Sequence, residues 1–204
     1  MPPAPSISRV YTKEELCLME KVADPCGIVI FGASGDLTRR KLIPSLFKLA
    51  QDNVLPKDYY ILGVARTDLS DASFQDKIRE DLSIFPDTKT RSDFIKRCKY
   101  LPGDYGKVSL YEGLRKRLSA LDLEHGVKGR RIFYLSTPPQ LYETLVQQLG
   151  ASGLASPRNE EGWVRVVIEK PFGRDLASAE TLNRAIRDVF QEDQIYRIDH
   201  YLGK

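Results

Sequence analysis

The chain has 204 residues, of which 42% are hydrophobic and 29% are charged, and its formal net charge is +3 at pH 7. This length and composition are typical of one sizeable globular domain, or of one domain and the beginning of a second. The mild positive charge suits small anionic ligands and excludes the strongly basic surface typical of nucleic-acid binding, and no apolar run is long enough to predict a membrane span.

The amino-terminal part of the chain is predicted to contain a leader, a short helix and a buried strand. Residues 1–8 are a Pro-rich leader and an amphipathic helix is expected over 12–22, so that leader and helix together occupy residues 1–24. Residues 28–31 are a continuous apolar run between glycines, which predicts a strand buried in a parallel sheet. Helical spacing then continues to about residue 50, and Pro44 is expected to kink or restart that helix.

Strands and helices alternate along the rest of the chain. Further strands are predicted at 60–65, 99–101, 132–135, 164–168 and 195–198. Further helices are predicted at 71–83, 91–98, 108–121, 140–149 and 175–190. This alternation predicts an α/β fold, a Rossmann-like open and mostly parallel sheet with helices on both faces. In that architecture ligands lie beyond the carboxyl ends of the strands.

The turn after the first strand is the first candidate binding site, with the sequence Gly32-Ala33-Ser34-Gly35-Asp36-Leu37. Its glycines allow the backbone to approach a pyrophosphate closely, and the following helix offers free N–H groups and the positive end of its dipole. The pattern GxxGxL is less specific than GxGxxG, but the strand before it and the helix after it are what phosphate binding requires. A glycine-rich turn that only joins two elements is the alternative.

Arg66 follows the second predicted strand and indicates which dinucleotide would bind. NAD-dependent enzymes commonly carry an acid at this place, which holds the ribose 2′-hydroxyl, whereas an arginine suits the 2′-phosphate of NADP. Arg39, Arg40 and Lys41 add positive potential nearby. A surface arginine without a ligand is the alternative.

Two longer strings also follow predicted strands: EKPFG at 169–173 and RIDHYLGK at 197–204. Together with GASGDL at 32–37 and PPQLY at 138–142, they resemble the glucose-6-phosphate 1-dehydrogenase family, in order and spacing from about Gly27 onward. The resemblance implies an oxidoreductase that oxidises glucose 6-phosphate at C1 to 6-phosphoglucono-lactone. It also implies NADP as the cofactor and a place at the first step of the pentose phosphate pathway.

The resemblance implies roles for individual residues. The cofactor would be bound by Gly32, Ala33, Ser34, Gly35, Asp36, Leu37, Thr38, Arg39, Arg66, Tyr142 and Lys170. The sugar phosphate would be bound by Lys170, His200, Tyr201 and Lys204, and the bond before Pro171 is expected to be cis. Without the resemblance, simpler interpretations apply to three of these residues. Lys170 would be a solvated charge at a strand end, Tyr142 an aromatic residue of a helix packed on the sheet, and His200 a histidine that caps a helix.

The chain is not expected to carry its own general base. Oxidation at C1 needs a general base, which is usually a histidine. The sequence has two histidines, His125 and His200. We expect His125 in a polar loop without a chemical role, while His200 resembles a phosphate ligand. Asp199 resembles the acid that orients the family's catalytic histidine, so Asp199 and Lys170 are the catalytic candidates here.

The resemblance places that histidine in a second α+β substrate domain, absent from this sequence. We therefore expect a leader and short helix over 1–24, a dinucleotide-binding domain over 25–198 and the start of a truncated substrate domain over 199–204. Such a chain is expected to bind NADP weakly and to turn over no sugar by itself. A full-length parent is expected to form a homo-oligomer through the missing domain.

Two other functions are weighed against this one. A catalytically silent NADP-binding module would share the same motifs. A short-chain reductase would need a Tyr-x-x-x-Lys pair, but Val146 stands four residues after Tyr142. The scattered Cys17, Cys26 and Cys98 predict reduced thiols, and we expect a cytoplasmic protein without nucleic-acid, membrane or metal partners.

Overall fold

The computed structural model describes residues 23–157, 159–173 and 175–199. The helix predicted over 12–22 lies outside the described residues. Within them, no helix is both long enough and apolar enough to cross a lipid bilayer.

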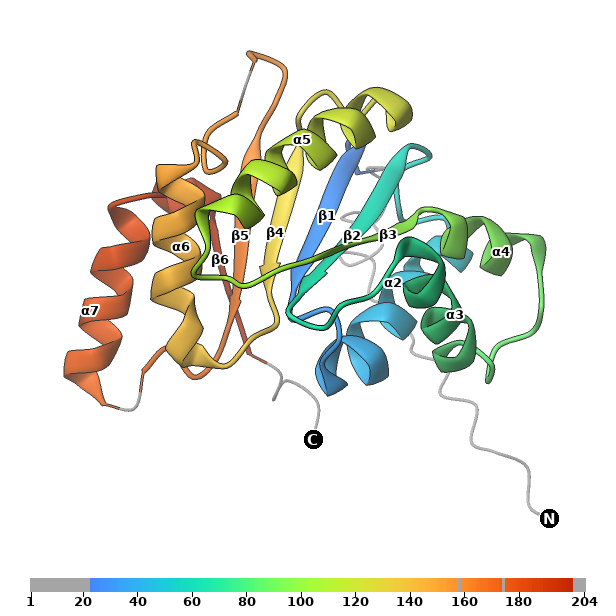
Figure 1. Cartoon of the computed structure of the whole chain (residues 1–204), viewed down its shortest axis with the longest axis horizontal. Helices are drawn as coiled ribbons and strands as arrows, with labels where there is room; N and C mark the ends of the chain where they lie inside the picture. The colour runs from blue at the N-terminus through green and yellow to red at the C-terminus, as the bar shows by residue number, and fades with distance from the viewer. Residues whose placement is uncertain (1–22, 158, 174, 200–204) are drawn as a thin grey trace, which may run out of the picture.

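The centre of the fold is a six-stranded sheet in the order β3-β2-β1-β4-β5-β6 (Figure 1). The strands are β1 (Cys26–Phe31), β2 (Tyr59–Ala65), β3 (Cys98–Pro102), β4 (Arg131–Leu135), β5 (Val164–Glu169) and β6 (Ile195–Ile198). Each neighbouring pair is parallel. The predicted Rossmann-like sheet is therefore confirmed, and its order places the carboxyl ends of β1, β2 and β4 next to one another.

Helices pack on both faces of this sheet. One face carries α5 (Val108–His125), α6 (Tyr142–Ala151) and α7 (Leu176–Arg187); in Figure 1 α5 runs across the strands, and α6 and α7 lie toward the left. The other carries α2 (Ile43–Gln51), α3 (Asp71–Asp81) and α4 (Lys89–Lys96). Short 3₁₀ turns, η2 (Pro139–Leu141) and η3 (Glu192–Gln194), precede α6 and β6. A separate hydrophobic cluster lies under each helical layer, so every residue of the central strands β1 and β2 is buried.

The helix after β1 is interrupted by a π-helical turn, η1 (Thr38–Leu42). Pro44, in the first turn of α2, has no N–H, and its ring would meet the carbonyl of the residue four positions earlier. The backbone widens ahead of it, so that the N–H of Ile43 donates to the carbonyl of Thr38, five residues back. The kink expected at Pro44 therefore takes the form of a π-helical turn over Thr38–Leu42, directly after the glycine-rich loop.

The expectation that His125 lies in a loop is wrong. His125 is the last residue of α5, because the helix continues until Gly126 ends it with φ of +64°. Its side chain packs beside the ring of Tyr60, with 5.7 Å between the ring centroids. The sequence pattern of leucines ends at Leu121, which is why the last turn of this helix was missed.

Two side chains of α3 bind the backbone of the outer strand β3. The backbone N–H of Tyr100 donates to Asp71 Oδ1 over 2.7 Å, and the amide of Gln75 donates to the carbonyl of Cys98 over 2.8 Å. Arg117 of α5 forms an ion pair with the same Asp71 of α3. Because α3 and α5 lie on opposite faces, this ion pair joins the two helical layers around the edge of the sheet.

Candidate nucleotide-binding site

The loop after β1 is a tight turn that passes close to two neighbouring strands. Gly32 has φ of +86°, and its N–H donates to the carbonyl of Val64 over 2.9 Å and to the hydroxyl of Tyr105 over 3.0 Å. A Cβ on Gly32 would lie only 2.0 Å from the carbonyl oxygen of Ser136 at the end of β4. Glycine is therefore required here by both conformation and space.

Hydrogen bonds fix this loop against the helix that follows it. The N–H of Gly35 and the buried hydroxyl of Thr38 both donate to the carbonyl of Gly32, over 2.9 and 3.1 Å. Ala33 is buried against the sheet, where Gly63 of β2 leaves room for it. Asp36 points into solvent, 3.6 Å from Arg40. The loop thus exposes backbone N–H groups at a helix start, which is an arrangement suited to a phosphate group.

A cleft of about 530 Å³ opens at the carboxyl ends of β1, β2 and β4. It is lined by Gly32, Ser34, Gly35, Ala65, Arg66, Thr67, Tyr105, Ser136, Thr137, Pro138 and Leu141. The sequence-predicted Gly32, Ser34, Gly35 and Arg66 are therefore brought together. Among the described residues that line this cleft, Arg66 is the only one with a positive charge. One end of the cleft is thus cationic and the rest presents hydroxyl and backbone groups.

Several lining residues were missed by sequence reasoning. Tyr105, in the loop after β3, accepts from Gly32 and donates to the carbonyl of Val64 over 3.3 Å. Burial raises the pKa of Tyr105, so its hydroxyl stays protonated and can donate. Thr67 donates to the hydroxyl of Ser34 over 3.0 Å. Thr137 lies just beyond β4, and its place at a strand end is the signal that could have found it.

A second group of predicted residues meets beyond β5 and β6. The peptide bond between Lys170 and Pro171 is cis, as expected. The ammonium of Lys170 lies 2.7 Å from Asp199 Oδ2, so the two catalytic candidates form an ion pair between the ends of neighbouring strands. About half of the Lys170 side chain is exposed. The structure therefore brings these two residues together at the same edge of the sheet as the cleft.

The structure does not bring Tyr142 into the cleft. Tyr142 is the first residue of α6, is 2% exposed and packs in the hydrophobic cluster under that helix. It continues the buried stripe of Leu145, Val146 and Leu149, and its hydroxyl donates to the carbonyl of Glu169 over 3.3 Å. Burial raises the pKa of Tyr142 to about 12. The helical period explains this position, since residues three, four and seven apart share one face.

Arg39 also lies away from the cleft. Its guanidinium forms a two-pronged ion pair with Asp81 of α3, with 2.9 Å between Nη2 and Oδ1. Leu37 is half-buried in the first helical turn. The proposed substrate ligands His200, Tyr201 and Lys204 lie outside the described residues.

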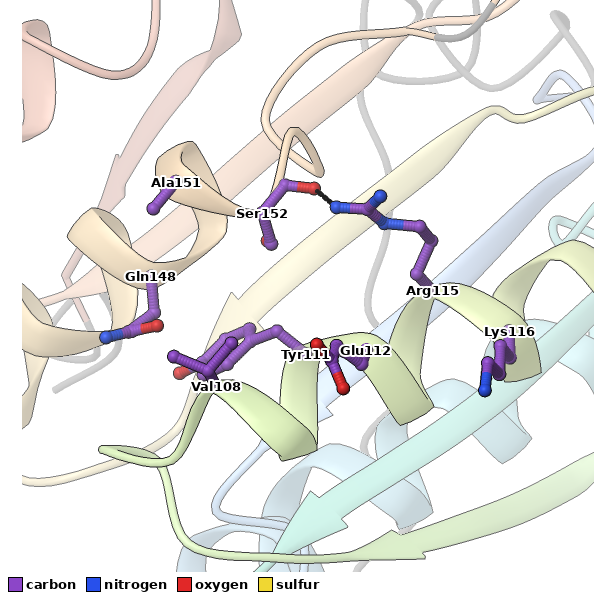
Figure 2. Close-up of a pocket in the computed structure, with 8 residues that line it drawn as sticks. All are labelled: Val108, Tyr111, Glu112, Arg115, Lys116, Gln148, Ala151 and Ser152. Carbon is purple, nitrogen blue, oxygen red and sulfur yellow. Dashed lines mark hydrogen bonds between the residues drawn. The ribbon is translucent and has the colours of Figure 1, made fainter.

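Another cavity, of about 490 Å³, lies between α5 and α6 (Figure 2). It is lined by Val108, Tyr111, Glu112, Arg115, Lys116, Gln148, Ala151 and Ser152. Arg115 extends from α5 and donates to the backbone oxygen of Ser152. The lining comes from helices rather than strand ends and mixes acidic with basic side chains. We assign the binding site to the cleft at the strand ends, where the glycine loop and Arg66 converge.

Comparisons with known proteins agree with this geometry. A family model described as "Glucose-6-phosphate dehydrogenase, NAD binding domain" matches residues 29–204. The chain is 40% identical over 190 residues to "Glucose-6-phosphate 1-dehydrogenase 2" of Mycobacterium tuberculosis, covering 91% of this chain and 37% of that protein. It is 45% identical over 184 residues to "Glucose-6-phosphate 1-dehydrogenase" of Aggregatibacter actinomycetemcomitans, covering 89% of this chain and 37% of that protein.

Solved structures show the same relationship. A structure titled "Glucose-6-phosphate dehydrogenase in complex with its substrate glucose-6-phosphate" superposes with a TM-score of 0.78 and 35% identity, covering 89% of this chain and 37% of that one. The enzyme from Mycobacterium avium gives a TM-score of 0.73 and 34% identity, covering 86% of this chain and 36% of that one. The chain thus spans a little over a third of the length of these relatives.

Proposed function

The chain belongs to the glucose-6-phosphate dehydrogenase family, and on that premise we propose that it is the NADP-binding part of an enzyme that oxidises glucose 6-phosphate at C1 to 6-phosphoglucono-lactone. The observation that carries this proposal is the cleft at the ends of β1, β2 and β4. A glycine-rich turn and an arginine face that cleft from neighbouring strands.

The glycine loop is proposed to hold the pyrophosphate. The close contact of Gly32 with Ser136 keeps the turn compact, and the helix start behind Gly35 supplies N–H groups and a favourable dipole. Ser34 and Thr67 add hydroxyl groups at the cleft wall. These groups recognise a phosphorylated dinucleotide without requiring a charged side chain in the loop.

Arg66 is proposed to select NADP over NAD. It follows β2, the strand beyond which dinucleotide-binding folds place the adenosine ribose. A guanidinium can bind the 2′-phosphate through two parallel hydrogen bonds. A charged hydrogen bond contributes about 1.5–3 kcal/mol, which corresponds to about ten- to a hundredfold in affinity.

The reacting end of the cofactor is proposed to lie near Lys170 and Asp199. When bound, the nicotinamide accepts the hydride that leaves C1 of the sugar. Lys170 is proposed to hold the sugar in reach, and Asp199 to position a base supplied by a part of the parent protein outside this chain. His200, Tyr201 and Lys204 are proposed to bind the substrate phosphate. We also propose that the parent enzyme is cytoplasmic and homo-oligomeric.

Titration calorimetry of the chain with NADP and NAD tests this function. We expect NADP to bind more tightly than NAD, and Arg66→Ala to weaken NADP binding about ten- to a hundredfold while leaving NAD binding within twofold. Arg40→Ala is the matched control, because Arg40 is exposed, lies near Asp36 and does not line the cleft. Failure of both nucleotides to bind at millimolar concentration would overturn the proposed function. An equal loss of both nucleotides in Arg66→Ala would overturn the role of Arg66.

A further inference from the structure

A smaller cavity, of about 120 Å³, lies behind the glycine loop, between η1, α2 and α3. Ser34 and Thr67 line both this cavity and the nucleotide cleft, and their hydroxyls are 3.0 Å apart. The two spaces therefore meet at this pair of hydroxyls, and Thr67 is the residue that follows Arg66. The volume is about four times the 30 Å³ that a water molecule occupies in the liquid, which is room for the few heavy atoms of a phosphate group.

Two cationic side chains line the cavity. Arg39 uses Nε and Nη2 to bind Asp81, whose side chain is 11% exposed, while its Nη1 makes no hydrogen bond to any residue in the described part of the chain. Lys77 of α3 also lines the cavity and forms no ion pair with a described residue. The Asp81 pair holds the Arg39 guanidinium in place, and no carboxylate of the described residues lies within ion-pair distance of the Lys77 ammonium.

We propose that this cavity holds the phosphate carried on the adenosine ribose of the bound dinucleotide, with Lys77 as a specificity-determining residue. The inference rests on the proposed function of the adjoining cleft. Arg66 lines the cleft, Lys77 and the Asp81-paired Arg39 line the cavity, and Ser34 and Thr67 line both, so that the phosphate would lie between cationic side chains from the two sides.

The charge balance of the ligand favours this arrangement. A phosphate monoester carries about −1.5 to −2 charges at neutral pH, so a single arginine leaves it incompletely neutralised. A second cation on the opposite side completes the neutralisation only when the 2′-phosphate is present. NAD, which has a hydroxyl there, gains little from it. Lys77 therefore contributes to the discrimination between the two cofactors rather than to dinucleotide binding in general.

The test compares Lys77→Met with Arg79→Met by titration calorimetry of the full chain with NADP and NAD. Methionine keeps an unbranched side chain with most of the aliphatic length and removes the charge. Arg79 lies on the same helix, is paired with Asp76 and does not line the cavity, so it is the matched control. We expect Lys77→Met to raise the Kd for NADP about three- to tenfold, at the lower end for a charged contact because Lys77 is exposed. The Kd for NAD should change less than twofold, and Arg79→Met should change neither.

Adenosine 2′-phosphate and inorganic phosphate serve as further probes. Weaker binding of adenosine 2′-phosphate to Lys77→Met, with inorganic phosphate bound weakly and equally by both forms, supports a site for a ribose-linked phosphate. An unchanged NADP affinity in Lys77→Met, or equal losses for NADP and NAD, overturns the inference. It leaves the proposed function intact, provided that the unmodified chain binds NADP. Failure of the unmodified chain to bind either nucleotide overturns both.

Discussion

Replacing Gly32 with alanine is expected to destabilise the domain by more than its conformational penalty alone. Gly32 adopts φ of +86°, and an alanine in the left-handed region costs about 1–2 kcal/mol. The new Cβ would also lie 2.0 Å from the carbonyl oxygen of Ser136, where contacts below 3.0 Å are not tolerated, so the end of β4 must move by about 1 Å. Overpacking of this kind costs about 1–3 kcal/mol, which gives about 2–5 kcal/mol in total.

Gly126→Ala is the matched control for this experiment. Gly126 is also left-handed, with φ of +64°, but nothing lies within 4 Å of a Cβ built there. It should lose only the conformational part, about 1–2 kcal/mol. Urea unfolding of both variants can be followed through the fluorescence of Trp163, which is the single tryptophan of the chain. Equal losses of unfolding free energy in the two variants would show that the close approach of the glycine loop to β4 adds no cost to a Cβ at position 32, contrary to this prediction.

Three further outcomes are expected. Asp122→Asn should lower the free energy of unfolding by about 3–5 kcal/mol in urea titration, because it leaves the guanidinium of the buried Arg131 without its counter-charge; a loss below about 1 kcal/mol would contradict this. Burial lowers the pKa of His125 in the folded state below its ordinary value of 6.5, so the unfolded chain takes up a proton first and stability should fall as pH drops below about 6.5. His125→Gln should flatten that part of a stability curve measured between about pH 5 and 7.5, and an unchanged slope would exclude His125 as its source. The chain alone, mixed with NADP and glucose 6-phosphate, should give no increase in absorbance from NADPH; sustained turnover would show that a general base is present in these 204 residues.

The strands and their connections could be predicted because their signals are local. The apolar run that forms β1 and the residues of the turns lie within a few positions of the feature that they specify, and the alternation of strands and helices follows from such local signals taken in order. The π-helical turn was anticipated only as a kink, because Pro44 shows that a hydrogen bond is lost but not how the backbone compensates. The last turn of α5 was missed, because its residues add no leucine to the buried stripe.

The candidate site was predictable only in part. Gly32 and Arg66 follow strands, and the rule that ligands lie beyond strand ends was sufficient to bring them together. The contact between Gly32 and Tyr105 joins residues 73 positions apart, and the pair of Arg39 with Asp81 joins residues 42 apart. No short pattern encodes such contacts. For Tyr142, the helical period favoured burial in the core over the role that the resemblance implied.

The contacts of α3 with β3 have a consequence for how this domain can associate. A bare edge strand presents N–H and carbonyl groups on which a strand of another molecule can pair, which leads to aggregation. Here the N–H of Tyr100 and the carbonyl of Cys98 already have side-chain partners, and Pro102 has no N–H to offer. Extension of the sheet past β3 would have to displace Asp71 and Gln75 and break the ion pair with Arg117. The side chains of α3 thereby make this edge of the sheet less available for pairing with a strand of another molecule.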